Sequence, residues 1–169
     1  LFSADFRGEE RMAQLLTQVA GRAGRANTRG TVLLQTHYPD HPAVRAMVTE
    51  TFASQARALM DKRAETGMPP FSQLLMLRVD STRQADGERF LQQLRHQVTS
   101  SLPADVSLIC PLPSAMPRRA GKFRSQLIMR APDRKSIQFC AGQLVNAAES
   151  MRQPRDLKWS LDIDPSEVM

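Results

Sequence analysis

The stretch KFRSQLIMR, residues 122–130, decides the fold of the second half of the chain. Its side chains alternate, because successive residues of a β-strand point to opposite faces of a sheet. One side consists of Phe123, Ser125, Leu127 and Met129. The other side consists of Lys122, Arg124, Gln126, Ile128 and Arg130. We therefore expect a strand with one face toward a core and the other face basic.

On both sides of this strand, hydrophobic periodicity and turn residues predict further elements. They are a strand at 74–80, a helix at 83–100, a strand at 106–110, a proline-rich loop, a helix at 133–151 and a strand at 157–162. This βαββαβ order predicts an α+β sandwich, with two helices on one face of a mixed sheet. The buried stripe expected for the second helix is Ile137, Cys140, Ala141, Leu144, Ala148 and Met151.

The first part of the chain predicts a helix, a turn and a strand, followed by a long helix. Met12, Leu15, Leu16 and Val19 recur at helical spacing within 9–25, and residues 31–36 are apolar and β-branched, typical of a buried strand. A helix over 41–66 ends at Gly67 and Pro69-Pro70. We expect a first segment at 1–40, a connecting helix at 41–68 and a C-terminal domain at 69–169.

Composition bounds the class of protein. The 169 residues are 41% hydrophobic, enough for a globular core, and no apolar run reaches the roughly 18 residues of a membrane span. No secretory signal opens the sequence, so we expect a cytoplasmic protein. The lack of an initiating Met suggests a fragment. Cys110 and Cys140 are thirty positions apart without partners at ligand spacing, which disfavours a disulfide framework and a zinc site.

Charge favours a polyanionic partner. The formal net charge is +6, and seven basic residues against one acid, Asp133, lie between positions 118 and 135. The DNA-contacting residues we expect are Arg118, Arg119, Lys122, Arg124 and Arg130. Phe123 or Phe71 could stack on a base, but with few aromatics the binding should be mainly electrostatic and salt-sensitive. The alternative is a solvated strand face.

The stretch QVAGRAGR, residues 18–25, carries the functional prediction. On a helix Gln18, Arg22 and Arg25 project within one narrow sector. Two guanidinium groups on one side suit a phosphate whose charge grows during transfer, as arginine fingers do, and Gly21 and Gly24 allow close backbone approach. The alternative is a surface helix with solvated arginines.

This stretch resembles the sixth conserved motif (motif VI) of superfamily 2 helicases at every defining position. The flanking segments LFSADFR (1–7), LLQT (33–36), PPF (69–71) and WSLDIDP (159–165) resemble the primosomal protein N′ (PriA) family of replication-restart helicases. The resemblance implies the C-terminal part of a bacterial ATP-dependent 3′-to-5′ DNA helicase. Such a helicase recognises stalled or abandoned forks in the cytoplasm, at the nucleoid, and initiates primosome assembly. Residues 1–40 would then end the second RecA-like motor lobe.

Carried over residue by residue, the resemblance implies that Arg25 is the finger and that Arg22 and Gln18 support it. The phosphate-binding GxxxxGK[ST] pattern is missing, because Lys122 is followed by Phe123 and no glycine lies at the required upstream position. A DExH segment is missing too. ATP and magnesium would thus be held by the full-length protein, zinc would be bound upstream, and this chain alone should neither bind ATP well nor hydrolyse it.

A second site follows from the resemblance, since helicases of this family engage the acidic tail of single-stranded DNA-binding protein. Arg134, Lys135 and Gln138 open the helix after Pro132 and could receive a terminal carboxylate. An ordinary exposed helix face is the alternative. Single-stranded and forked DNA and other primosome proteins are the remaining partners implied. Two other classes stay open, namely a freestanding nucleic-acid-binding module and a protein-interaction module.

Overall fold

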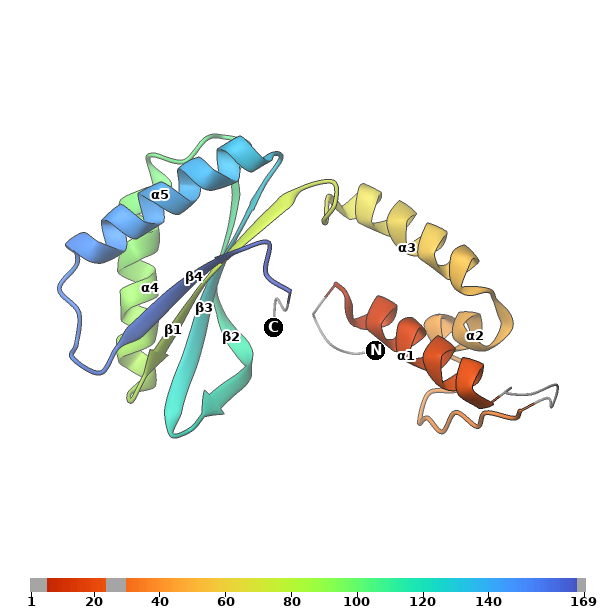
Figure 1. Ribbon diagram of the computed structural model, residues 1–169. Helices are drawn as coiled ribbons and strands as arrows, with labels where there is room; N and C mark the ends of the chain where they lie inside the picture. The colour runs from red at the N-terminus through yellow and green to blue at the C-terminus, as the bar shows by residue number, and fades with distance from the viewer. Residues whose placement is uncertain (1–5, 24–29, 167–169) are drawn as a thin grey trace. The chain divides into compact units, whose positions relative to one another are not determined.

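The computed structural model describes residues 6–23 and 30–166. The chain divides into two compact units, Leu1–Thr66 and Gly67–Met169. Helices make up the regular structure of the first unit's described residues, and a four-stranded sheet with two helices makes up the second (Figure 1). The boundary between units thus falls between Thr66 and Gly67, and the three segments expected from the sequence stay a prediction.

The second unit has the predicted βαββαβ order. Its elements are β1 (Gln73–Ser81), α4 (Gln84–Thr99), β2 (Ser107–Arg119), β3 (Lys122–Ala131), α5 (Arg134–Ser150) and β4 (Lys158–Ile163). The strands lie in the order β2-β3-β1-β4, and each neighbouring pair is antiparallel. The expected mixed sheet is therefore wrong. Because β3 lies between β1 and β2, those two parallel strands are never neighbours, as in ferredoxin-like folds.

One face of this sheet carries the core. Strand residues Leu77 of β1 and Met129 of β3, at 0% exposure, pack in one cluster with buried residues of α4 and α5. The predicted stripe of α5 is confirmed, since Ile137, Cys140, Ala141, Leu144 and Ala148 are buried and Met151 packs against the cluster. Gly87 lets α4 approach β1 closely, because a Cβ there would lie 3.1 Å from Ser81 Oγ. Both helices thus cover the same face, as Figure 1 shows.

The segment expected to be a proline-rich loop is part of strand β2. The strand continues to Arg119, with irregular register between Ile109 and Leu112 and again between Pro113 and Arg118. Prolines are tolerated here because β2 is an edge strand, which has a neighbour on one side alone. Ala120 and Gly121, with φ of 48° and 77°, then turn the chain into β3. Positive φ at both positions is the requirement of a tight hairpin.

In the first unit the helices are α1 (Gly8–Ala23), α2 (Pro42–Thr49) and α3 (Phe52–Thr66). The prediction of a single helix over 41–66 is wrong, because the helix is interrupted at Glu50, whose backbone is extended. Thr51 caps the start of α3, because its Oγ1 accepts a hydrogen bond from the N–H of Ser54 at 3.3 Å. Gln55 Nε2 donates to the carbonyls of Ala46 and Glu50. Local side-chain hydrogen bonds thus replace the helical ones at the break.

The strand expected over 31–36 is also wrong. These residues are irregular, and Leu33 is 92% exposed. A strand needs a neighbour to satisfy its backbone, and the described residues of the first unit contain none. The apolar face of α1 differs from expectation in the same way. Ala13 is its buried residue, whereas Leu15 and Val19 are 60% and 45% exposed.

Two ion pairs join the first turn of α1 to the last turn of α3. Lys62 Nζ lies 3.1 Å from Glu9 Oε1, and Arg63 Nη2 lies 2.6 Å from Glu10 Oε2. The Arg63 guanidinium also lies over the Phe6 ring, 5.0 Å from its centre. The Arg63 side chain is 14% exposed and that of Lys62 is 64% exposed. Arg63 should therefore contribute more to stability, because water screens an exposed pair.

We expect Arg63→Ala to destabilise the first unit by about 1–3 kcal/mol, since it removes a charge-assisted hydrogen bond and a cation–π contact. Lys62→Ala, the matched control, should cost less than about 1 kcal/mol. Hydrogen exchange of the α1 amides measures this unit separately from the sheet. Equal loss of protection in both variants would contradict the assignment.

The N-terminal cap of α5, Asp133, makes a contribution to the stability of the fold that depends on pH. Asp133 accepts the N–H of Ser136 at 2.8 Å and its hydroxyl at 3.2 Å. The backbone bond from Ser136, with its side-chain bond, lowers the pKa of the Asp133 carboxyl below its ordinary value. A pKa that is lower in the folded state stabilises the fold above the unfolded-state value, near 4, and the gain is lost as pH falls through the folded value.

We expect Asp133→Ala to lower the thermal midpoint by a few degrees at pH 7, because an orphan N–H of α5 loses its acceptor. Asp133→Asn should keep most of the midpoint, since an amide oxygen still accepts that N–H. The gap between wild type and the Ala variant should close toward pH 3. Circular dichroism melts at pH 7, 5 and 3 measure this, and a gap that does not depend on pH would count against a charged cap.

Candidate functional site

Helix α1 presents part of the motif found in the sequence. It stays helical through Ala23, so that Gln18 and Arg22 lie one turn apart on the same side. Both side chains are exposed, and the structure records no hydrogen bond or ion pair of Arg22 with the residues it describes. Gly24 and Arg25 lie outside the described residues, so the predicted role of Arg25 stays a prediction. The described part of the motif is thus a polar surface that is accessible to another domain or molecule.

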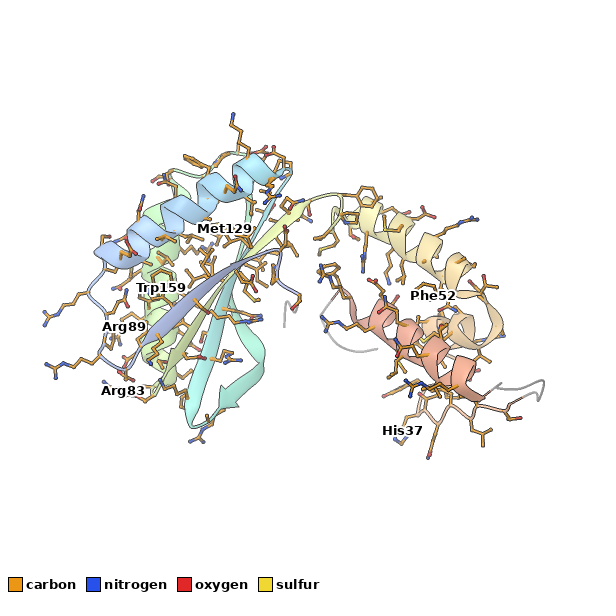
Figure 2. The ribbon with its side chains drawn as sticks, viewed as in Figure 1. His37, Phe52, Arg83, Arg89, Met129 and Trp159 are labelled. Carbon is orange, nitrogen blue, oxygen red and sulfur yellow. The ribbon has the colours of Figure 1, made fainter. Side chains whose placement is uncertain are left out.

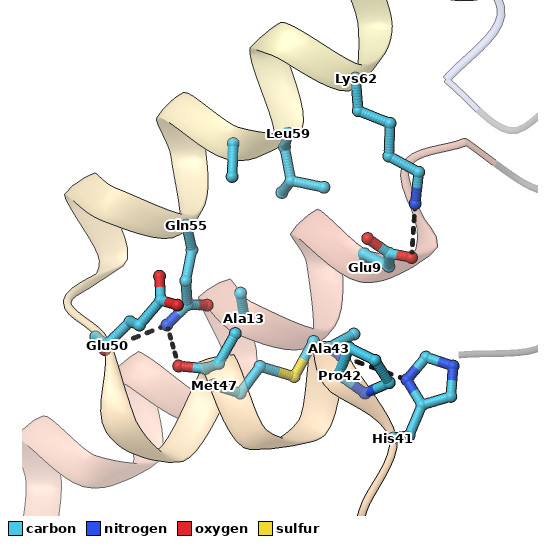
Figure 3. A pocket seen from close by; sticks show the side chains of 12 residues that line it. Glu9, Ala13, His41, Pro42, Ala43, Met47, Glu50, Gln55, Leu59 and Lys62 are labelled. Atoms are coloured by element: carbon cyan, nitrogen blue, oxygen red, sulfur yellow. Dashed lines mark hydrogen bonds and ion pairs between the residues drawn. The ribbon is translucent and has the colours of Figure 1, made fainter.

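A pocket lies beside this helix but does not include the motif. It has a volume of about 530 Å³ and lies between α1, α2 and α3 (Figure 3). Small apolar side chains such as Ala13 and Ala43 line it, and the Glu9–Lys62 ion pair lies at one end. His41 Nδ1 accepts the N–H of Ala43 there and begins α2. Neither Gln18 nor Arg22 lines the pocket, so the described part of the motif lies on the open surface of the helix.

The basic residues of β3 are largely engaged within the molecule. Arg124 Nε lies 2.9 Å from Asp80 Oδ1 of the neighbouring strand, and Arg130 Nη1 donates to the carbonyl of Gly67 at 3.4 Å. Between them Gln126 and Ile128 are 1% and 4% exposed. Leu127 and Met129 lie in the core cluster as the alternation predicted, but the expectation that the other face is basic is wrong for the middle of the strand. The middle of the strand is covered, and both of these arginines have intramolecular partners.

The remaining predicted DNA contacts lie at the β2–β3 hairpin. Arg118 is exposed, with its guanidinium over the Phe123 ring, 5.4 Å from the centre, and Lys122 is half-buried. The side chain of Arg119 lies outside the described part. Arg118 therefore occupies one face of the ring that could have stacked on a base. Phe71, at 50% exposure, is the other aromatic candidate.

The start of α5 is an accessible polar surface. Arg134, Lys135 and Gln138 are all exposed, while Ile137 between them faces the core. Sequence reasoning missed Phe139, which is 48% exposed and lies one helical turn from Lys135. Its position outside the buried stripe was the available signal. An aromatic ring beside cations fits a partner with a carboxylate and an apolar side chain.

No group of three or more His, Cys, Asp and Glu that could hold a metal ion occurs among the residues described. Burial raises the pKa of the Cys140 thiol, with a contribution from the charge of Asp105. The thiol is therefore a poor nucleophile at neutral pH. In the described part of the chain, no helix is both long and apolar enough to cross a membrane.

Comparison with known proteins gives a family. The family described as the primosomal protein N C-terminal domain matches residues 64–166. Curated relatives called replication restart protein PriA include that of Haemophilus influenzae, 34% identical over 99% of this chain and 23% of the relative. Those of Synechocystis and Bacillus subtilis are 30% and 26% identical, each over 98% of this chain and over 19% and 20% of the relative.

The chain spans about a fifth of the length of these relatives. Among solved structures it is similar to the de novo designed protein Foldit4, with a TM-score of 0.43 and 10% identity over 56% of this chain and 98% of that one. The family match covers α4, α5 and the whole sheet, and the relatives extend it across α1. The chain therefore belongs to the PriA family of replication restart proteins, whose C-terminal domain is formed by residues 64–166.

Proposed function

We propose that this chain is the C-terminal part of an ATP-dependent 3′-to-5′ DNA helicase. The helicase recognises stalled or abandoned replication forks in the bacterial cytoplasm, at the nucleoid, and initiates primosome assembly. The family match over residues 64–166 is the observation that carries the proposal. The printed name of the relatives, replication restart protein, supports the biological role.

In this proposal residues 1–40 end the second motor lobe. Exposed apolar side chains support it, because Leu33, Leu15 and Val19 are 92%, 60% and 45% exposed. A folded domain rarely leaves so many large apolar groups in water unless another surface covers them. The rest of the lobe is the surface proposed here. ATP and magnesium are then bound outside this chain, as is zinc.

The contribution of this chain to ATP hydrolysis is electrostatic. Arg25 acts as the finger on the γ-phosphate, and Arg22 and Gln18 support it. Guanidinium groups hold their charge at every working pH and offer paired N–H donors, which suits the oxygens of a transferring phosphoryl group. The exposure of Gln18 and Arg22 supports this role, because their donors are available to a nucleotide held by another lobe.

We expect Arg25→Ala and Arg22→Ala in the complete helicase to lower kcat for ATP hydrolysis, Arg25→Ala by at least about 100-fold. The effect on the KM for ATP should be smaller, since the finger acts mainly on the transition state. Arg45→Ala, an exposed arginine of α2, is the control. The 169-residue chain alone should show no turnover. Unchanged hydrolysis and strand separation in Arg25→Ala would exclude the finger.

The second unit supplies the binding surfaces in this proposal. Arg118, Arg119 and Lys122 at the hairpin contact single-stranded or forked DNA. Arg124 and Arg130 join them when their side chains leave their internal partners. The start of α5, with Arg134, Lys135 and Gln138, receives the acidic tail of single-stranded DNA-binding protein. Its exposed cations and the neighbouring Phe139 support that role. Other primosome proteins complete the assembly.

We expect Arg134→Glu to weaken binding of a short acidic peptide with a free carboxyl terminus by about tenfold or more, because a cation that pairs with it becomes a repelling anion. Arg152→Glu, just beyond the other end of the same helix, makes the same charge change and should have little effect. Fluorescence anisotropy of a labelled peptide with the 169-residue chain compares the two. Equal affinity in both variants would reject the start of α5 as the site.

A further inference from the structure

One end of the sheet gathers charged residues from three segments far apart in the sequence. It is the end at which β1 finishes and β3 and β4 begin, since Ser81 pairs with Phe123 and Asp80 pairs with Lys158. The loop before β4 is joined to it, because Asp156 Oδ2 accepts both the N–H and the hydroxyl of Thr82. Helix α4 starts there too.

The carboxylates at this end are each held by groups of the protein. Asp80 pairs with Arg124, and Asp156 is bound by Thr82. Asp86, in the first turn of α4, lies 3.0 Å from Arg83 and 3.8 Å from Arg89. Its side chain is only 13% exposed. Another acid, Glu88, accepts a hydrogen bond from Gln84 at 2.8 Å. These anions therefore organise the local structure, and Asp86 is the one whose low exposure the structure records most clearly.

The cations point outward by comparison. Arg83 and Arg89 are 79% and 68% exposed although they share one carboxylate (Figure 2). A guanidinium has five N–H donors, so each keeps donors for another partner. Arg155 and Lys158 are exposed beside them in the loop before β4 and in its first residue. We call Arg83, Arg89, Arg155 and Lys158 the sheet-end cluster.

The sheet-end cluster differs from the basic residues of β3 in the number of N–H donors that remain available to a ligand. Arg124 and Arg130 are tied to Asp80 and to the Gly67 carbonyl. In the cluster, Asp86 orients Arg83 and Arg89 without neutralising both, and all four side chains are exposed. The proximity of Arg83 also contributes to the lowered pKa of Asp156, after the two bonds from Thr82. Arg83 thus lies near both acids.

The chemistry of the cluster fits a chain of phosphates. Its cations come from the β1–α4 connection, from α4 and from the start of β4, so they are spread over a surface, and one small anion could reach only some of them. Guanidinium forks bind phosphate oxygens in pairs. Trp159, the aromatic residue next to Lys158, is half-buried, so contact should be with the nucleic-acid backbone more than with bases.

We propose that the sheet-end cluster binds the phosphate backbone of single-stranded DNA and extends the hairpin contact formed by Arg118 and Lys122. The inference rests on the proposed DNA binding of this unit and names the surface that carries it. It moves the path of the strand away from the middle of β3 and toward the end of the sheet.

The test uses the 169-residue chain and a fluorescein-labelled 20-nucleotide oligo(dT), with anisotropy titrations at 50, 100 and 200 mM NaCl. We expect the double variant Arg83→Ala, Arg89→Ala to bind at least about tenfold more weakly at 50 mM. The slope of log affinity against log salt should become shallower by about 1.4, since each lost single-strand phosphate contact contributes about 0.7. Arg155→Ala, Lys158→Ala should act in the same direction.

The matched control is Arg57→Ala, Arg95→Ala, which removes the same charge from exposed positions. Arg57 lies on α3, and Arg95 lies on α4 about 18 Å of helix from Arg83. We expect this variant to bind within about twofold of wild type. Circular dichroism melts verify that each variant is folded. Asp86→Asn serves as an independent variant that should bind at least twofold more tightly, because it frees both arginines.

The outcomes separate the inference from the proposed function. If the wild-type chain does not bind oligo(dT) at 50 mM, the proposed DNA contact of this unit fails and the inference fails with it. If wild type binds but folded cluster variants and Asp86→Asn bind equally well, the cluster is rejected while the DNA contact stands. Unchanged oligo(dT) binding with lost binding of polyglutamate would reject it too, and would identify the cluster as a surface for acidic polypeptides.

Discussion

The antiparallel pairing of β3 between β1 and β2 is the constraint on which the second unit depends. It forces the chain to cross the sheet twice, and the core shows that both crossing helices cover the same face. It also fixes which loops meet. The starts of α4, β3 and β4 come to one end of the sheet, and the start of α5 comes to the other. Residues as distant as Thr82 and Asp156 are neighbours for this reason.

The same pairing determines which charges remain available. Asp80 and Arg124 are 44 positions apart but face each other across β1 and β3, so their charges are satisfied internally. Where a carboxylate serves two arginines, as Asp86 does, positive charge is left over. Counting basic residues along the sequence cannot separate these cases. The net charge of +6 therefore favours a polyanionic partner, and the topology determines which basic residues remain available to it.

Sequence patterns predicted the elements of the second unit because its signals are strong and local. The helical stripe from Ile137 to Ala148 matches what is buried, and Leu127 and Met129 of β3 lie in the core as the alternation predicted. Gln126 and Ile128, on the other face of that strand, are buried as well, which the alternation did not predict. Strand order could not be predicted in this way, since it depends on pairing between distant segments. The extension of β2 through its prolines depends on its being an edge strand, which is again a property of the whole sheet.

In the first unit the errors have a different cause. At the helix break at Glu50, hydrogen bonds of the Thr51 and Gln55 side chains compete with the helical backbone bonds, and the periodicity of apolar residues does not reveal this competition. The apolar run 31–36 has strand composition but no partner strand in the described residues. For the candidate sites, the motif on α1 was visible in sequence because its residues are close together. The sheet-end cluster was not, because its members come from separate segments.

The two polyanion surfaces proposed for the second unit are electrostatically independent. Strand β3 has ten residues, which at about 3.3 Å per residue separates its ends by about 30 Å. The screening length at physiological ionic strength is about 8 Å. The electrostatic potential of a charge bound at the sheet-end cluster is therefore almost fully screened at the start of α5. Occupation of one surface by DNA should therefore neither repel nor attract an acidic tail at the other. One small domain can then hold a DNA strand and a protein tail at the same time, without the energetic competition that a single basic patch would impose.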